Sequence, residues 1–214
     1  MTRVVDLLNT GLVKPRPPGL RPPGLRPPID FGEATVIDFD DVADGAIVDT
    51  HYASKGVTFA SVTNNPPRRW SSYARAVWGV ESAPNCVSVV APPALGFFDA
   101  RQGGVEASFT RPQRWVSVDA KIVLPPEFMS TPTARPFLEA YNADGKVLGR
   151  VYYPLAYGDP GYGSWQTLIH SSASADIVKV IFSSAYSGPT PVYGLFDQLA
   201  FCTKISLMPH PLGS

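Results

Sequence analysis

The sequence predicts an all-β domain, an antiparallel β-sandwich or jelly roll, that follows a proline-rich N-terminal extension. Proline and glycine are abundant, with 23 and 18 residues among 214, and this density works against long helices. Short apolar runs bounded by turn residues recur about every ten residues from residue 34 to residue 203. Several of these runs alternate apolar and polar residues, which is typical of strands that are buried on one face.

The expected strands lie between Asp, Gly, Pro and Asn residues. They cover residues 34–39, 56–62, 73–80, 86–91, 104–110, 115–123, 136–155, 164–171, 176–185 and 193–203. In the run 115–123 the alternate positions that should face the core are Val116, Val118, Ala120 and Ile122. The run 136–155 should be a hairpin, because Asp144-Gly145 supplies the positive φ of a tight turn.

Composition divides the chain into an N-terminal peptide (1–13), a stalk (14–30), a β-sandwich domain (31–205) and a tail (206–214). Within the stalk, residues 14–28 repeat the motif RPPGL, and their prolines favour a polyproline-II spacer of roughly 45 Å at about 3.1 Å per residue. A disordered linker and a PxxP ligand for an SH3-like groove are the alternatives.

The N-terminal peptide carries an apolar cluster that is too short to fold alone. Its members are Val4, Val5, Leu7, Leu8 and Leu12. The cluster is either a frayed terminus or a docking peptide that orders against neighbouring subunits. In the second case residues 1–30 would fasten the chain into a homo-oligomer or a larger assembly.

Charge and motifs exclude several classes of function. The chain has 18 basic and 18 acidic residues, and this balance argues against a nucleic-acid binder. We expect no membrane insertion, since no apolar stretch is long enough, and the N-terminus shows no recognisable secretory signal. No nucleophile elbow, zinc-protease motif or phosphate-binding loop occurs, so we expect a protein that is not an enzyme.

Aromatic residues supply the candidate ligand-binding side chains. Trp70 and Tyr73 lie beside several arginines, and Tyr157, Tyr162 and Trp165 lie in or beside a loop rich in glycine and proline. Rigid aromatic platforms suit the apolar faces of sugars, and the same residue types suit protein interfaces. The alternative is that these rings fill the core of the sandwich.

The two cysteines, Cys86 and Cys202, fall on different expected strands. They would form a disulfide only if those strands adjoin in an oxidising compartment, and otherwise they are free buried thiols.

Three segments together resemble a known family. They are "TVIDFDDVADGAIVDTHYASKGVTFASV", "FLEAYNADGKVLGRV" and the closing pair "SWQTLIHSSASADIVKVIFSS" and "YGLFDQLAF". In this order they resemble the carbohydrate-binding-module-like, galactose-binding-like jelly rolls of bacterial exported proteins. The resemblance implies a sandwich of two antiparallel sheets with a structural calcium where the first and last strands meet.

The residues suit such a calcium, because Ca²⁺ binds several oxygen ligands at once. Asp40 and Asp41 follow the first strand, and Asp197 shares the parity of Leu199 and Phe201, so its carboxylate should point inward and need a partner. The expected ligands are therefore Asp40, Asp41 and Asp197. The alternative is a solvated acidic loop, with Asp197 hydrogen-bonded to backbone amides.

Two functions follow from these observations. One is a non-catalytic, calcium-stabilised head that presents loop aromatics to a glycan. The other is a structural subunit of a fibre, capsid or secretion-type particle that uses the N-terminal segment for assembly.

Overall fold

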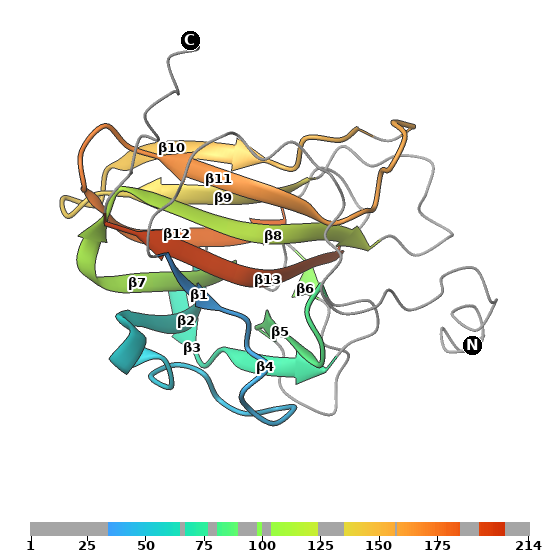
Figure 1. Cartoon of the computed structure of the whole chain (residues 1–214), viewed down its shortest axis with the longest axis horizontal. Coiled ribbons are helices and arrows are strands. Elements are labelled where there is room, and N and C mark those ends of the chain that lie inside the picture. The colour runs from blue at the N-terminus through green and yellow to red at the C-terminus, as the bar shows by residue number, and fades with distance from the viewer. Residues whose placement is uncertain are drawn as a thin grey trace, which may run out of the picture.

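The computed structural model describes residues 34–64, 67–76, 81–89, 98–99, 104–123, 135–156, 158–184 and 193–203. These residues form two antiparallel sheets packed face to face as a β-sandwich, as the sequence predicts (Figure 1). The N-terminal peptide, the stalk and the tail lie outside the described residues. No helix of the described segments has the length and apolar character needed to cross a bilayer.

One sheet is built around the last strand, and we call it the β13 sheet. Its central path runs β11-β8-β13-β5-β4, and the short strands β1 and β6 also pair with β13. The strands are β1 (Thr35–Ile37), β4 (Tyr73–Ala76), β5 (Asn85–Ser88), β6 (Phe98–Asp99), β8 (Trp115–Val123), β11 (Gln166–Ser171) and β13 (Tyr193–Cys202).

The second sheet, which we call the β7 sheet, runs in the order β10-β9-β12-β7-β2-β3. Its strands are β2 (Val57–Asn64), β3 (Pro67–Trp70), β7 (Gly104–Gln113), β9 (Pro136–Tyr141), β10 (Val147–Tyr152) and β12 (Ile177–Ser184). One short 3₁₀-helix, η2 (Ala53–Lys55), leads into β2. Strand β12 pairs with β7 on one side and β9 on the other, so segments distant in sequence lie side by side.

The core lies between the sheets and follows the expected alternation. On β8 the side chains of Val116, Val118, Ala120 and Ile122 are buried, as their spacing predicts. The hairpin of β9 and β10 is also present, and Gly145 adopts a φ of 75° in its turn. The Asn142 side chain accepts hydrogen bonds from the backbone N–H groups of Asp144 and Lys146 and so holds this turn closed.

A β-bulge interrupts β13 between Asp197 and Ala200, where the register with β8 shifts. Gln198 lies in the bulge with a φ of 48°, an uncommon conformation for a residue other than glycine. Because of the shift, Phe196 and Leu199 both belong to the core cluster. Asp197 is fully buried. The sequence predicts its burial by assuming that Asp197 and Leu199 lie on the same side of a regular strand, but the bulge breaks this alternation.

Candidate functional site

The outer surface of the β7 sheet gathers charged and aromatic side chains from several strands. Leu138 and Ala140 of β9 and Val180 and Phe182 of β12 belong to the core, so the residues between them face outward. Strand pairing places Arg150 opposite Glu139, Glu139 opposite Ile181, and Ile181 opposite Glu106. These residues therefore form one row across β10, β9, β12 and β7. We call this surface the charged face. Its members are Arg69, Glu106, Ser108, Phe137, Glu139, Tyr141, Arg150, Tyr152, Lys179 and Ile181.

Glu106 lies at the centre of one half of the charged face. Its Oε1 atom accepts hydrogen bonds from Arg69 Nη1 at 2.8 Å and Ser108 Oγ at 3.1 Å, and its Oε2 atom lies 3.2 Å from Lys179 Nζ. Burial by itself raises the pKa of Glu106, but the hydrogen bond from Arg69 and the charge of Lys179 outweigh burial and hold the pKa below its ordinary value. Glu106 is therefore a fixed, ionised carboxylate.

Glu139 organises the other half of the charged face. Its Oε2 atom accepts a hydrogen bond from Arg150 Nε at 2.6 Å and lies 2.5 Å from Arg150 Nη2. Its Oε1 atom accepts a hydrogen bond from the Tyr141 hydroxyl. Burial and the hydrogen bond to Glu139 together raise the pKa of the Tyr141 hydroxyl. Arg150 also donates from Nη1 to the Tyr152 hydroxyl at 3.2 Å.

Cations lie against the aromatic rings of this face. The guanidinium carbon of Arg150 is 4.5 Å from the ring centre of Phe137, and Lys179 Nζ is 4.9 Å from that of Tyr141. These distances are those of cation–π contacts. Tyr152 is the exposed aromatic residue of the face, with 45% of its surface accessible. The arrangement is a rigid array of donors and rings with few freely rotating groups.

A second cluster lies where the segment after β1 meets β13 and the turn before β5, and we call it the acidic corner. Its residues are Asp38, Asp40, Ser82, Asn85 and Asp197. The Oδ2 atom of Asp197 accepts the backbone N–H of Ser82 at 2.8 Å and its hydroxyl at 3.0 Å. Asp40 accepts the backbone N–H of Asn85 at 2.8 Å.

Hydrogen bonds at the acidic corner only partly offset the loss of hydration of its carboxylates. Burial raises the pKa of Asp197 to about 8, because hydrogen bonds from Ser82 and Gln198 offset only part of the lost hydration. Burial and the nearby charges of Asp38 and Asp41 also raise the pKa of Asp40. Asn85 is 1% exposed, and its Oδ1 atom has no hydrogen-bond partner among the described residues.

These oxygens are of the chemical kinds that calcium binds. Two carboxylates and one unpaired amide oxygen offer the hard ligands that Ca²⁺ binds, and a cation would compensate the buried charge of Asp197. Asn85 Nδ2 donates to the carbonyl oxygens of Phe39 and Val42, so the amide is held with Oδ1 turned away from these acceptors. Phe39 has a φ of 62°, so the backbone is in an uncommon conformation beside Asp40, as it is beside Asp197.

The structure brings together two of the three carboxylates that the sequence predicts as calcium ligands. Asp40 and Asp197 both interact with Ser82. Asp41 instead accepts the Tyr52 hydroxyl at 2.5 Å and lies 3.5 Å from Lys55 Nζ. Within the described residues no three His, Cys, Asp or Glu side chains gather as a metal site, so a calcium there would need the amide of Asn85.

The aromatic residues that the sequence predicts as ligand-binding lie in separate places. Trp70, at the end of β3, packs against the core, and its Nε1 donates to the Val89 carbonyl at 3.1 Å. Tyr73 begins β4 at an edge of the β13 sheet. Tyr162 also packs against the core, with its ring centre 6.3 Å from that of Tyr153.

Trp165 precedes β11, and Lys121 Nζ lies 5.8 Å from its ring centre. Tyr157 and the apolar N-terminal cluster lie outside the described residues. A role in ligand binding for these aromatic residues stays a prediction. Both cysteines are buried, and no disulfide joins them.

The residues of the charged face are not among the functional residues predicted from the sequence. The signal that could have found them is an alternation in the predicted hairpin, where Glu139 and Tyr141 share parity on one strand and Arg150 and Tyr152 share it on the other. Glu106 and Lys179 join them only through the pairing of β12 with β7 and β9.

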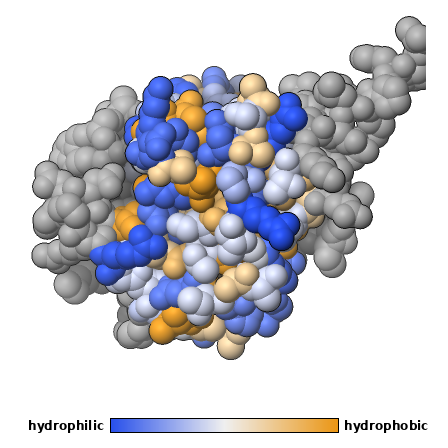
Figure 2. Space-filling view, turned by 90° about the vertical axis from the view of Figure 1, so that its left-hand side faces the viewer, coloured by the Kyte–Doolittle hydropathy of each residue, from blue (hydrophilic) through white to orange (hydrophobic). Residues whose placement is uncertain are grey.

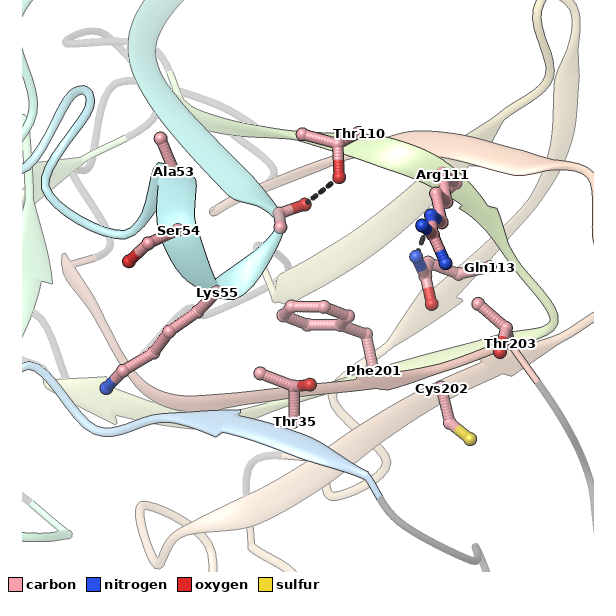
Figure 3. A pocket seen from close by; sticks show the side chains of 11 residues that line it. Thr35, Ala53, Ser54, Lys55, Thr110, Arg111, Gln113, Phe201, Cys202 and Thr203 are labelled. Carbon is pink, nitrogen blue, oxygen red and sulfur yellow. Dashed lines mark hydrogen bonds between the residues drawn. The ribbon is translucent and has the colours of Figure 1, made fainter.

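One end of the sandwich carries the β9–β10 turn, the β11–β12 turn and η2, and its surface is largely hydrophilic with small separated hydrophobic spots (Figure 2). A pocket of about 360 Å³ opens between η2, β7 and the end of β13. Phe201 lies in the middle of the pocket, between Lys55 on one side and Arg111 on the other (Figure 3). None of the described aromatic residues predicted to bind ligand lines it.

No protein-family model matches the chain, and no curated protein matches its sequence. Among solved structures, the K2 cleaved adhesin domain of Lys-gingipain is similar at 11% identity and a TM-score of 0.43, covering 78% of this chain and 98% of that one. The K1 cleaved adhesin domain of Lys-gingipain from Porphyromonas gingivalis W83 is similar at 12% identity and a TM-score of 0.38, covering 81% and 99%.

The CBM22-1 xylan-binding domain of Xyn10C from Paenibacillus barcinonensis is similar at 11% identity and a TM-score of 0.40, covering 80% of this chain and 95% of that one. At such scores these neighbours identify neither a family nor a ligand for this chain.

Proposed function

We propose that residues 34–203 form a non-catalytic glycan-binding domain whose binding surface is the charged face of the β7 sheet. The observation that carries this proposal is the connected array of ion pairs and aromatic rings that runs from Arg150 on β10 to Arg69 on β3. Glycans present many hydroxyl groups and apolar C–H faces. A surface of fixed donors and an exposed Tyr152 ring matches both.

The charges of this face favour a glycan over a protein partner. The centre of a protein–protein interface is depleted of charged residues. Here Glu106, Glu139 and Lys179 lie on the inner strands β7, β9 and β12, and all three are in ion pairs. Preorganised polar groups of this kind suit a hydroxyl-rich ligand, because little side-chain entropy remains to be lost on binding.

The same ion pairs argue against glycoside hydrolysis. A glycosidase needs one carboxyl group with a raised pKa that donates a proton to the leaving oxygen. Glu106 has a lowered pKa, and both oxygens of Glu139 accept hydrogen bonds from Arg150 or Tyr141. Neither carboxyl group is placed as a proton donor.

We further propose that the acidic corner binds a structural calcium through Asp40, Asp197 and Asn85. The support is the buried carboxyl group of Asp197, whose charged form burial disfavours and a bound cation would favour, and the unpaired Oδ1 atom of Asn85. When bound, the ion would supply positive charge between β13 and the segment after β1. The role of this site is to stabilise the fold, and the glycan is bound elsewhere.

A glycan array probed with the full chain tests the binding proposal. Tyr152→Ala should reduce binding to every glycan that the wild-type chain retains, by about tenfold for the loss of one exposed ring worth about 1.4 kcal/mol. Trp165→Ala is the matched control, because the sequence predicts Trp165 as a ligand residue and it precedes β11, a strand of the β13 sheet. Loss of binding in Trp165→Ala with full binding in Tyr152→Ala would move the site to the loop before β11. A blank array would overturn glycan binding.

The assembly role is a separate proposal, supported by the apolar residues 1–13 and the repeated RPPGL motif. A chain that starts at Phe31 should elute from size-exclusion chromatography as a smaller species than the full chain. Equal oligomeric states of the two chains would contradict the proposal.

A further inference from the structure

In the ion pairs of the charged face, the carboxylate side chains are less exposed than the cationic side chains. In the pair of Arg69 with Glu106 the side chains are 59% and 8% exposed, and in the pair of Lys179 with Glu106 they are 32% and 8% exposed. In the pair of Arg150 with Glu139 they are 39% and 10% exposed. In each of these pairs, therefore, the accessible partner is the cation.

The carboxylate oxygens are already occupied by protein donors. Both oxygens of Glu106 and both of Glu139 accept hydrogen bonds from side chains of the same face. In contrast, Arg69 uses Nη1 for Glu106, and an arginine has five N–H donors. Lys179 donates to Glu106 through one of the three N–H groups of an ammonium. A ligand therefore meets N–H donors and net positive charge.

The cations also occupy ring surface that a neutral sugar would use for stacking. Arg150 lies over Phe137, and Lys179 lies over Tyr141. Tyr152 remains accessible at the β10 edge. Recognition of a ligand over the rest of the face must then depend on acceptor groups that meet guanidinium and ammonium N–H donors.

The cationic positions extend across the whole sheet. Arg150 lies on β10, Lys179 on β12 and Arg69 on β3, and β10 and β3 are the two edges. The five strand spacings between these edges amount to roughly 24 Å at about 4.8 Å each. A ligand that contacts all of these cations is a chain that runs across the strands, with acidic groups at more than one position.

We infer that the charged face selects an acidic polysaccharide, one whose sugars carry carboxylate groups, over a neutral one. The planar guanidinium groups of Arg69 and Arg150 match carboxylates in shape and charge. This inference rests on the proposed function, since it names the class of glycan that the same face binds.

Binding of the full chain to oligogalacturonate and oligoglucuronate, measured by calorimetry in calcium-containing buffer, tests the inference. The controls are the same oligomers after chemical reduction of their carboxyl groups, which keeps chain length and linkage but removes charge. We expect at least one acidic oligomer to bind ten times more tightly than its reduced form, and the difference to shrink as salt is added.

Variants locate the effect on this face. Arg69→Gln and Lys179→Gln should each weaken binding of the acidic oligomer severalfold and weaken binding of the reduced oligomer less. Lys146→Gln is the matched control, because Lys146 is an exposed cation in the β9–β10 turn. Circular dichroism of each variant establishes that the fold is retained.

The outcomes separate the two proposals. Equal affinity for acidic and reduced oligomers would overturn the preference for carboxylates and leave glycan binding in place. If neither acidic nor reduced oligomers bind while neutral glycans on the array do, the preference is again overturned. Single-stranded DNA that binds as tightly as the acidic oligomers would show charge attraction alone and would also overturn the inference. Loss of binding in Lys146→Gln equal to that in Arg69→Gln would remove the assignment to this face.

Discussion

Two regions of this domain bury carboxylates, and they compensate the buried charge in different ways. At the charged face, Arg69 and Lys179 outweigh the burial of Glu106 and lower its pKa. At the acidic corner, Asp197 receives hydrogen bonds from Ser82 and Gln198, and burial still raises its pKa to about 8. A buried carboxylate is thus no sign of function by itself. What distinguishes the regions is whether the chain supplies the compensating cation, and at the acidic corner we propose that calcium does so.

The largest expected effect follows from this difference. Calcium at a hundred times its Kd should stabilise the wild-type chain by about 2.7 kcal/mol, because a ligand that binds only the folded state raises the free energy of unfolding. Asp197→Asn removes a charged ligand and should abolish most of this gain. The measurement is the Tm of both chains in calcium and in EDTA. A wild-type Tm that is the same in both buffers would reject the calcium site.

The charged face should respond to the loss of a carboxylate without any metal. Glu106→Gln keeps the shape of the side chain but removes the charge that holds Arg69 and Lys179. Charge-assisted hydrogen bonds contribute more than neutral ones, so we expect a loss of about 1 to 2 kcal/mol in the free energy of unfolding. Urea denaturation in calcium and in EDTA should give the same loss. A loss that appears only in calcium would link the two regions and contradict their separation.

The fold class and the hairpin could be predicted from the sequence because both depend on local patterns. The inward positions of β8, from Val116 to Ile122, follow from alternation, and the turn at Gly145 follows from its two residues Asp-Gly. Strands β3 and β6 are short, and the sequence does not single them out. The bulge at Gln198 changes the face of the sheet on which the following side chains lie, and no local sequence pattern predicts it.

The charged face could not be predicted because it depends on strand order. Glu106 and Lys179 are far apart in the sequence and meet only because β12 pairs with β7. Tertiary packing sets this pairing, and local propensity does not encode it. Asp197 was predicted as buried and Asp40 as its neighbour, but Asn85 was not identified, since a single amide at the start of a short strand gives no signal of its own.

A smaller effect concerns acid stability at the charged face. A carboxyl group whose pKa is lower in the folded chain contributes stability above its ordinary value, which is 4.5 for Glu106, and loses that contribution as the pH falls through the folded pKa. The free energy of unfolding of the wild-type chain should therefore decrease below about pH 4.5. Glu106→Gln should flatten part of this decrease. An identical pH dependence in the two chains would show that Glu106 is not the group responsible.

The smallest expected effect tests which carboxylates belong to the acidic corner. The sequence predicts Asp41 as a calcium ligand, whereas its carboxylate contacts Tyr52 and Lys55, and both members of the pair with Lys55 are about half exposed, at 46% and 44%. An exposed ion pair contributes about 0 to 1 kcal/mol. Asp41→Asn keeps an acceptor for the buried Tyr52 hydroxyl, so the Tm should fall slightly and by a similar amount in calcium and in EDTA. Lys55→Ala is the matched control for the lost ion pair. If Asp41→Asn instead removes the response to calcium as Asp197→Asn does, Asp41 is a ligand, and the calcium-bound loop differs from the arrangement around Tyr52.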